Sequence, residues 1–212
     1  AVKRGIPVAH VEAGLRSFDR TMPEEINRLL TDAISDALFV TEPSGMENLA
    51  REGVPEDRVF LTGNVMIDTL LASRERARQS TVPDRLGLGE KGYGVLTLHR
   101  PSNVDDEAIL RGLLGVLGEI GARRPLVFPV HPRTRARLET LGIPLGREDG
   151  FVLCDPLGYL DFLRLMEGAA LILTDSGGIQ EEACILEVPC LTLRKNTERP
   201  VTVDVGMNRL VG

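Results

Sequence analysis

Residues Leu171 to Pro200 have the residue types of a phosphate-binding unit. An apolar run, 169–173, has the character of a strand buried on both faces, and it ends at TDSGG (174–178), ahead of a helical pattern that begins near Ile179. Glycines let backbone N–H groups approach an anion, and a helix start adds unpaired donors and a positive dipole end. An ordinary strand–turn–helix unit has the same outline. The polar segment that closes the stretch, ending in TERP (197–200), favours a nucleotide-diphosphate site.

Acid–base side chains are expected just after the predicted strands: Glu12, His99, His131 and Asp175, with Glu24 and Glu25 at a nearby helix start. All three histidines of the chain, which include His10, fall at predicted strand ends. Each group has a plain structural explanation, since a histidine can be a hydrogen-bonded structural residue and a carboxylate can complement a helix dipole. Ligands of open parallel sheets bind outside the carboxyl ends of the strands. The joint placement therefore predicts acid–base work on a nucleotide-linked substrate between two domains.

Several other chemistries lack their motifs. The chain has no G-x-x-x-x-G-K-[ST], no G-x-S-x-G around Ser176 and no G-x-G-x-x-G, and Cys154, Cys184 and Cys190 have no metal-ligand spacing. We therefore expect no metal and no redox cofactor, and buried free thiols of a cytoplasmic protein. A net charge of −6 argues against nucleic-acid and anionic-membrane partners, and no apolar run has membrane-spanning length.

The elements that must position these groups alternate between strand and helix. Apolar runs and helical periodicity predict a first unit with strands at 6–11, 37–40 and 59–64 and helices that begin at Pro23 and Ser44. A second unit has strands at 93–98, 126–130, 151–154, 169–173 and 188–193 and helices at 105–120 and 159–167. This rhythm predicts an α/β fold with doubly wound parallel sheets.

Residues 67–92 change character, with a charged stretch around Arg74 followed by scattered glycine and proline. We interpret them as a solvated linker or hinge helix between the C-terminal part of a first Rossmann-like domain (1–66) and a second, nucleotide-binding Rossmann-like domain (93–212). The chain starts at Ala1 and enters a strand almost at once, so we expect a fragment or a chain without its first segment.

Seven short motifs occur in a fixed order: HVEAGLRS (10–17), PEEINR (23–28), TGN (62–64), LHRPSNVD (98–105), PVHPRT (129–134), TDSGGIQEEA (174–183) and TERP (197–200). Together they resemble the non-hydrolysing UDP-N-acetylglucosamine 2-epimerases. The resemblance spans essentially the whole chain, although members of that family run well beyond 212 residues. It implies two Rossmann-like domains in the glycosyltransferase-B arrangement, the first incomplete and the second, UDP-binding one without its closing helix.

The resemblance implies an isomerase of cell-envelope polysaccharide biosynthesis that interconverts UDP-GlcNAc and UDP-ManNAc. In that family UDP is eliminated across C1–C2 to leave a 2-acetamidoglucal and is then added back with the opposite configuration at C2, without a redox cofactor. The implied partners are a UDP-sugar substrate, a second UDP-GlcNAc as activator and a second copy of the chain in a homodimer.

The resemblance also assigns roles to individual residues. Glu12 and Glu24 match the acid–base carboxylates, and His99 matches the catalytic imidazole. The substrate-binding positions that match are Ser176, Gly177 and Gly178 for the diphosphate, Glu182 for the ribose, Arg199 for phosphate, Phe162 for uracil, His131 for the sugar and a regulatory ligand, and Arg100.

Two departures leave alternatives open. Ser102 replaces the acid of the usual HRxEN pattern, and Leu157 stands where many members have a polar residue. A related UDP-sugar, such as a diacetamido-uronic one, therefore remains a candidate substrate. A retaining UDP-glycosyltransferase shares the fold and the ribose-binding carboxylate. A catalytically silent UDP-sugar-binding fragment is the third reading, because the basic residues and the aspartate of the family's first segment are not in this chain.

Overall fold

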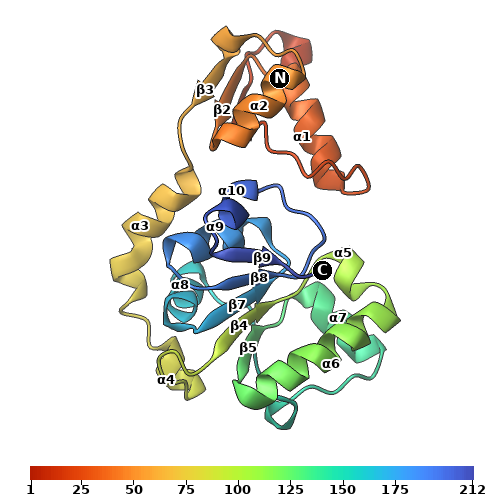
Figure 1. The fold of residues 1–212 in the computed structure, drawn as a ribbon, viewed down its shortest axis with the longest axis vertical. Coiled ribbons are helices and arrows are strands. Elements are labelled where there is room, and N and C mark those ends of the chain that lie inside the picture. The colour runs from red at the N-terminus through yellow and green to blue at the C-terminus, as the bar shows by residue number, and fades with distance from the viewer.

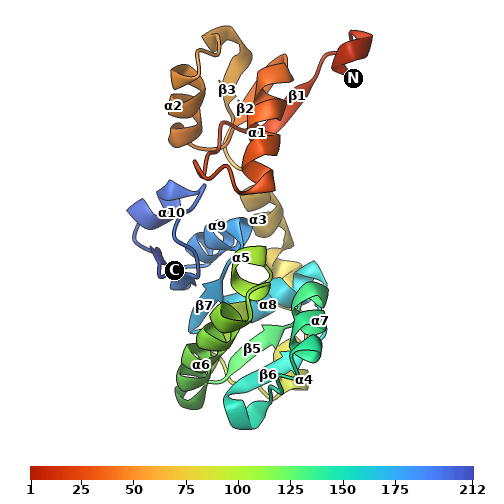
Figure 2. The ribbon, with the colours of Figure 1, turned by 90° about the vertical axis from the view of Figure 1, so that its right-hand side faces the viewer.

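The computed structural model describes residues 1–212 and contains two parallel sheets joined by a helix (Figure 1). The smaller sheet has three strands in the order β1-β2-β3, and the larger one has six in the order β6-β5-β4-β7-β8-β9. We call the two parts the three-stranded domain and the six-stranded domain. Figure 2 shows α9 and α10 below the three-stranded domain and α3 along the connection between the two parts.

The three-stranded domain is a short β-α-β-α-β unit. Its elements are β1 (Ala9–Ala13), α1 (Pro23–Ile34), β2 (Ala37–Val40), α2 (Pro43–Arg51) and β3 (Val59–Leu61). Both helices begin with proline, whose fixed φ suits the first helical position and whose missing N–H is not needed there. The fully buried core of this unit is small: Ala13, Leu38, Val40 and Leu49.

A buried carboxylate on α1 organises the segment that follows β1. Asp32 lies 2.5 Å from Nδ1 of His10 and 2.7 Å from Nη2 of Arg16, and it accepts the backbone N–H of Gly14 at 3.0 Å. Burial raises the pKa of Asp32, but the bonds from His10 and Arg16 outweigh it and leave the pKa below its usual value. His10 therefore lies within β1 and pairs with α1, so the prediction that all three histidines stand at strand ends is wrong for His10.

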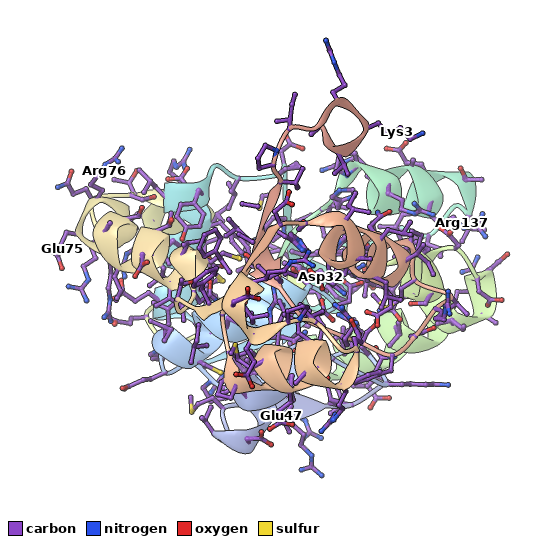
Figure 3. The ribbon with its side chains drawn as sticks, turned by 90° about the horizontal axis from the view of Figure 1, so that it is seen from above. Lys3, Asp32, Glu47, Glu75, Arg76 and Arg137 are labelled. Atoms are coloured by element: carbon purple, nitrogen blue, oxygen red, sulfur yellow. The ribbon has the colours of Figure 1, made fainter.

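Charged side chains of the three-stranded domain and the linker differ in whether they point into the molecule or outward. Seen from above, Asp32 lies inside the molecule, whereas Lys3, Glu75 and Arg76 project outward (Figure 3). Of the charges that make the linker look solvated in the sequence, Glu75 and Arg76 thus lie on its outer side, whereas Arg74 faces α8 and pairs with Glu167 at 2.8 Å.

The six-stranded domain has the order of a Rossmann fold. Its strands are β4 (Gly94–Thr97), β5 (Leu126–Pro129), β6 (Phe151–Cys154), β7 (Leu171–Thr174), β8 (Cys190–Thr192) and β9 (Asn208–Leu210). Its helices are α5 (Pro101–Val104), α6 (Glu107–Arg123), α7 (Pro132–Thr140), α8 (Tyr159–Gly168), α9 (Gly177–Ile185) and α10 (Pro200–Asp204). The strand order reverses between β4 and β7, and ligands of such sheets bind at that crevice.

Both faces of the larger sheet are buried, as the sequence predicts for a doubly wound fold. Val95 and Ile172 point to one face, where they pack with Leu163 and other residues of α8. Their neighbours along the strands point to the other face and pack with Leu110 and other residues of α6. Figure 1 shows α8 and α6 on opposite sides of the strands. No helix of the structure combines the length and apolarity needed to cross a bilayer.

The linker is a pair of packed helices, α3 (Val65–Ala77) and α4 (Val82–Leu86). The expectation of a solvated helix is wrong, because Leu70, Ala77 and Val82 are fully buried in the core of the six-stranded domain. Leu70 and Ala77 are seven residues apart and so share one narrow stripe, which the surrounding charges conceal in the sequence. The chain passes between the domains just before α3, where Gly63 has a φ of 81° that suits glycine.

Candidate active site

Glu12 lies in β1 at an irregular position. The strand begins at Ala9, three residues later than predicted, and its pairing with β2 shifts register between Val11 and Ala13. Glu12 occupies this bulge with a φ of 68°, a left-handed conformation that is unfavourable for a residue with a side chain. Its Oε2 lies 3.2 Å from Nη2 of Arg199 in the six-stranded domain. The bulge thus turns the Glu12 carboxylate out of the sheet and across to the other domain.

The consecutive carboxylates at the start of α1 have different surroundings. Glu25 is buried and accepts the backbone N–H groups of Ser17 at 2.8 Å and Phe18 at 3.0 Å, so it holds the preceding loop. Glu24 faces the six-stranded domain, with its Oε1 2.5 Å from Nη1 of Arg100. Burial opposes ionisation of Glu24, but its backbone N–H and the Arg100 charge outweigh burial and lower its pKa. Glu24 is therefore an ionised carboxylate between the domains.

His99 stands where the strand order reverses. Thr97 and Thr174, the last residues of β4 and β7, are joined through their hydroxyl oxygens at 2.6 Å. Just beyond them, Nδ1 of His99 lies 2.8 Å from Oδ1 of Asp175, which is completely buried. The other oxygen of Asp175 accepts the backbone N–H groups of His99 and Arg100, both at 2.8 Å. A buried carboxylate therefore holds the imidazole at the crevice.

A cavity of about 290 Å³ opens beside His99 at the carboxyl ends of β4 to β7. Its lining includes His99, His131, Leu157, Phe162, Ser176 and Ile179. The rings of His99 and His131 have centroids 5.5 Å apart. The structure thus brings four of the predicted site residues, from β-strand ends, α8 and the start of α9, around one cavity.

The segment predicted to bind a diphosphate, Ser176 to Gly178, lies at the start of a helix. The expectation of a glycine-rich turn ahead of a helix that begins near Ile179 is wrong, because α9 begins at Gly177 with Ser176 as its N-cap. Side-chain ends lie close to both glycines: a Cβ at Gly177 would lie 2.4 Å from Oε1 of Glu198, and one at Gly178 would lie 2.7 Å from Cε of Met66, so either substitution would displace the end of a flexible side chain. The N–H groups of this turn have no partner within the helix and remain donors for an anion.

The two consecutive acidic residues of α9, Glu181 and Glu182, have different partners. Glu182 is buried and its Oε1 accepts the hydroxyl of Tyr159 at 3.0 Å, and burial raises its pKa. Oε1 of Glu181 accepts the Asn64 amide at 2.7 Å, and Oε2 lies 2.8 Å from Nε of Arg199. Burial raises the pKa of Glu181 to about 7 against the opposing Arg199 charge. Sequence reasoning missed Glu181; the signal was the second consecutive acid, whose side chain leaves the helix about 100° away from that of Glu182.

Arg199 joins the two domains. It precedes α10 and is 5% exposed, with Glu12 of the three-stranded domain on one side and Glu181 of α9 on the other. Its Nη1 is buried without a hydrogen-bond partner. A buried guanidinium with an unused donor is suited to a phosphate oxygen.

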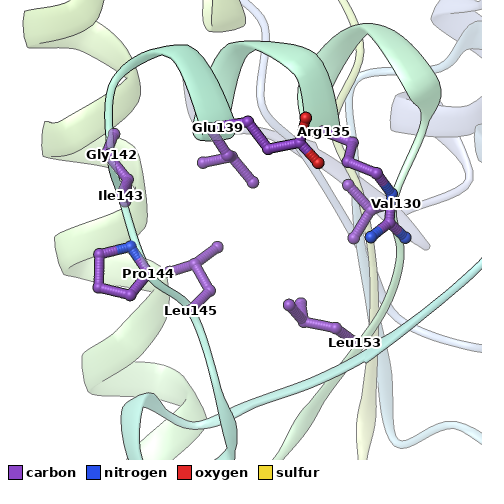
Figure 4. Close-up of a pocket in the computed structure, with 9 residues that line it drawn as sticks. Val130, Arg135, Glu139, Gly142, Ile143, Pro144, Leu145 and Leu153 are labelled. Carbon is purple, nitrogen blue, oxygen red and sulfur yellow. The ribbon is translucent and has the colours of Figure 1, made fainter.

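Two other cavities differ in their relation to the predicted site residues. A groove of about 430 Å³ between α7 and β6 is lined by Arg135, Glu139, Ile143, Leu145 and Leu153 and contains none of the predicted site residues (Figure 4). A cavity of about 840 Å³ lies between the start of α1 and α5 and is lined in part by Glu24, Arg100 and Ser102. The departure at Ser102 therefore lies beside the Glu24–Arg100 pair, away from the cavity that His99 lines.

Comparison with known proteins identifies the family. The family model described as UDP-N-acetylglucosamine 2-epimerase matches residues 1–212. The chain belongs to this family. It is similar to UDP-N-acetylglucosamine 2-epimerase of Methanocaldococcus jannaschii, with 48% identity over 225 residues that cover 100% of this chain and 60% of that relative. It is also similar to UDP-2,3-diacetamido-2,3-dideoxy-D-glucuronate 2-epimerase of Pseudomonas aeruginosa, with 43% identity over 100% of this chain and 58% of that relative.

Solved structures of this epimerase family share the fold. The M. jannaschii enzyme in complex with UDP-GlcNAc and UDP superposes with a TM-score of 0.93 at 48% identity, over 100% of this chain and 60% of that one. A second structure of the same enzyme gives 0.77 at the same identity and covers 100% of this chain and 61% of that one. The Neisseria meningitidis enzyme bound to UDP-GlcNAc gives 0.87 at 36% identity, over 100% and 59% of the two chains. The chain as a whole thus superposes better on the M. jannaschii complex than on the second structure of that enzyme.

Proposed function

We propose that this chain supplies the UDP-binding domain and part of the sugar-facing domain of a UDP-GlcNAc 2-epimerase, an isomerase that interconverts UDP-GlcNAc and UDP-ManNAc. The observation that carries the proposal is the placement of Arg199. This buried arginine contacts Glu12 across the domain boundary and keeps an unused donor close to Glu181 on α9. Carboxylate, phosphate-binding cation and helix start are the parts that elimination of UDP from a sugar requires.

The reaction is a reversible elimination. A base removes the proton from C2, the C–H electron pair becomes the C1–C2 double bond, and the C1–O bond breaks as its electrons leave with UDP. In the return step an oxygen of the UDP β-phosphate attacks C1 and a proton is delivered to C2 on the opposite face. No oxidant or reductant is consumed, and UDP must stay bound between the two steps.

The acid–base groups of this proposal are Glu12, Glu24 and His99. The lowered pKa of Glu24 keeps this carboxylate ionised, as a proton acceptor must be before the reaction, and the Arg100 charge that lowers it has to be offset for the carboxylate to take up a proton. Glu12 lies next to the arginine that we assign to the phosphate, so it can serve the adjacent sugar carbon. His99 lines the 290 Å³ cavity and is suited to donate a proton to, or accept one from, a group held there.

The UDP group is assigned to the six-stranded domain. Gly177 and Gly178 offer the N–H groups of the first turn of α9 to the diphosphate, and the N-cap Ser176 offers its hydroxyl, because its own N–H donates to the Thr174 hydroxyl at 3.0 Å. Glu182 takes the ribose hydroxyls, and the Tyr159 hydroxyl holds its carboxylate in position. Phe162 supplies an aromatic side chain for uracil. The proposal also places His131 and Arg100 at the sugar, where they approach His99 and Glu24 respectively.

We extend the proposal to regulation, assembly and location. A second UDP-GlcNAc near His131 acts as activator, the protein is a homodimer, and it works in the cytoplasm, where free thiols such as Cys190 stay reduced. Sigmoidal dependence of the rate on UDP-GlcNAc tests the activator, and light scattering on the whole protein tests the dimer. Hyperbolic kinetics would contradict the activator, and the mass of a monomer would contradict the homodimer.

The deciding experiment is an NMR assay of the whole protein with UDP-GlcNAc in deuterated water. We expect UDP-ManNAc to appear with deuterium at C2, because the proton removed by the base exchanges with solvent before return. Bound UDP with neither product nor exchange would contradict the assignment and favour a UDP-glycosyltransferase or a binding protein.

A second substrate is favoured by one specific observation. Ser102 departs from the family pattern beside the Glu24–Arg100 pair, and the P. aeruginosa relative acts on a diacetamido-uronic UDP-sugar, as its name states. Parallel assays with both UDP-sugars decide between them. A kcat/KM for UDP-GlcNAc at least about tenfold higher, equivalent to about 1.4 kcal/mol, supports the main proposal.

A further inference from the structure

The Asp175 carboxylate accepts several hydrogen bonds from the segment that follows β4. Its Oδ2 accepts the backbone N–H groups of His99 and Arg100 at 2.8 Å each, and the Asn103 amide at 3.2 Å. Asn103 also donates to the backbone oxygen of Leu193 at 2.9 Å, which ties the same segment to the end of β8. The carboxylate is completely buried, so water does not compete for these bonds.

The remaining oxygen of Asp175 has one neighbour that can donate to it. Oδ1 is buried and has no fully aligned hydrogen-bond partner, and Nδ1 of His99 lies 2.8 Å from it as an ion-pair contact. Burial raises the pKa of Asp175, but the bonds from the His99 side chain and from the backbone of Arg100 and His99 outweigh it and lower the pKa. Asp175 is therefore an ionised acceptor, and an ionised carboxylate can only accept hydrogen bonds.

We propose that Asp175 is the positioning residue for His99: it fixes the proton of the neutral imidazole on Nδ1 and leaves Nε2 as the nitrogen that acts on the bound UDP-sugar. The role in turnover rests on the proposed epimerase function, whereas the tautomer rests on the geometry alone. Because Nε2 lies on the opposite side of the ring from Nδ1, it is the nitrogen free for the cavity that His99 lines. The same arrangement of buried acid and imidazole sets the tautomer in hydrolytic triads.

An acid-to-amide substitution should reverse the tautomer. In Asp175→Asn, the two backbone N–H groups that bind Oδ2 require an acceptor, so the amide oxygen takes that position. The amide NH₂ then faces Nδ1 of His99 and can only donate to it. Nδ1 becomes the acceptor, and the imidazole proton moves to Nε2.

The test uses ¹⁵N-histidine labelling of the whole protein, in which this chain contributes three histidines. Long-range ¹H–¹⁵N spectra should show His99 protonated on Nδ1 in the wild type and on Nε2 in Asp175→Asn. Asn103→Ala is the matched control, because it removes a donor to Oδ2 without touching the His99 contact, and the tautomer should stay on Nδ1. A wild-type His99 protonated on Nε2 overturns the proposal and needs no variant that folds.

The turnover rate of variants provides a second test of the proposal. We expect Asp175→Asn to lower kcat about 100-fold with little change in KM, because proton transfer by the correct nitrogen is lost. In a His99→Ala background the same substitution should change kcat less than about twofold, since Asp175 acts through His99. Equal losses in the two backgrounds would show a merely structural role and overturn the proposal. A wild-type protein that does not epimerise counts against the proposed function, while the spectra still decide the tautomer.

Discussion

Glu12 combines an unfavourable backbone conformation with the contact that reaches the other domain. Its φ of 68° is one that glycine would adopt without strain, yet a carboxylate occupies the position. Strain of this kind persists only where the surroundings enforce it, and here β2 pairs with both neighbours of Glu12. The carboxylate is retained at an energetic cost, which agrees with a role in chemistry.

We predict that Glu12→Gly is more stable than Glu12→Ala by about 1 kcal/mol, because both lose the carboxylate and only alanine keeps the left-handed penalty. Both variants should lose turnover. Urea unfolding of the pair, with the NMR assay alongside, measures the two effects. An alanine variant as stable as the glycine variant would show that the bulge relaxes, and turnover in either variant would remove Glu12 from the acid–base groups.

Glu198 gives the stability of the protein a dependence on pH. It is 2% exposed and lies 2.8 Å from Arg194 and 3.4 Å from Arg28 of α1. Burial raises its pKa, but Arg194, the Glu198 backbone N–H and Arg28 outweigh burial and lower the pKa to about 2. Since the folded pKa lies below the unfolded value, this stabilisation is present above about pH 4.5 and is lost as the pH falls towards about 2.

Glu198→Gln should therefore lower the free energy of unfolding at neutral pH by about 2–3 kcal/mol and flatten its decline between about pH 4.5 and 2. Denaturant titrations at several pH values measure both quantities. Glu47→Gln is the control, because Glu47 pairs with Arg51 on an exposed surface and should contribute little. Parallel pH profiles for the wild type and Glu198→Gln would contradict the assignment.

The start of α3 connects the hinge to the phosphate-binding helix. Asn64 caps α3 by accepting the N–H of Met66 at 2.9 Å, and its amide donates to Glu181 on α9 at 2.7 Å. Met66 in turn packs against Gly178. One N-cap residue thus fixes the end of the interdomain connection to the helix that we assign to the diphosphate.

We predict that Asn64→Ala costs about 2 kcal/mol of unfolding free energy, the sum of a lost cap and a buried carboxylate that loses a donor. Asp106→Ala is the comparison, because the Asp106 side chain caps α6 by accepting the N–H of Ile109 and makes no hydrogen bond to another element. It should cost about 1 kcal/mol. Equal costs, measured by denaturant unfolding, would show that the Glu181 contact contributes nothing.

The two domains are held together by ion pairs on the side where the site lies. Glu24 pairs with Arg100, Arg28 with Glu198, and Glu12 with Arg199. Because the connection at Gly63 is short and glycine-containing, we infer that these pairs control how far the domains separate.

Arg100→Ala should increase the radius of gyration of the ligand-free protein at about 0.05 M salt, and raising salt to about 1 M should do the same to the wild type, because the partly exposed Glu24–Arg100 pair is screened. Small-angle X-ray scattering measures the change. Arg133→Ala removes the Arg133–Asp105 pair, which lies within the six-stranded domain, and should leave the radius unchanged. A radius insensitive to Arg100 and to salt would show that other contacts set closure.

Local sequence patterns were sufficient to predict the α/β class and the parallel strands. An apolar run such as 126–130 is typical of a strand buried on two faces, and helical periodicity marks α1, α6 and α8. Ligands of parallel sheets bind beyond the carboxyl ends of the strands, which predicts that residues following those ends lie close together. In the structure His99, His131 and Ser176 line one cavity. The roles of these residues remain predictions, because geometry alone does not report turnover.

Tertiary structure decided which charged groups face each other. Arg199 and Glu12 are 187 positions apart, and no local pattern relates them. His10 was expected at a strand end but pairs with Asp32 of α1, and the linker was expected to be solvated although its Leu70 packs into the six-stranded domain. Gly177 was expected in the turn before the helix, whereas it is the first residue of α9 and lies against the carboxylate of Glu198. Residue type and periodicity act over a few positions, but ion pairing and close packing depend on segments that meet only after folding.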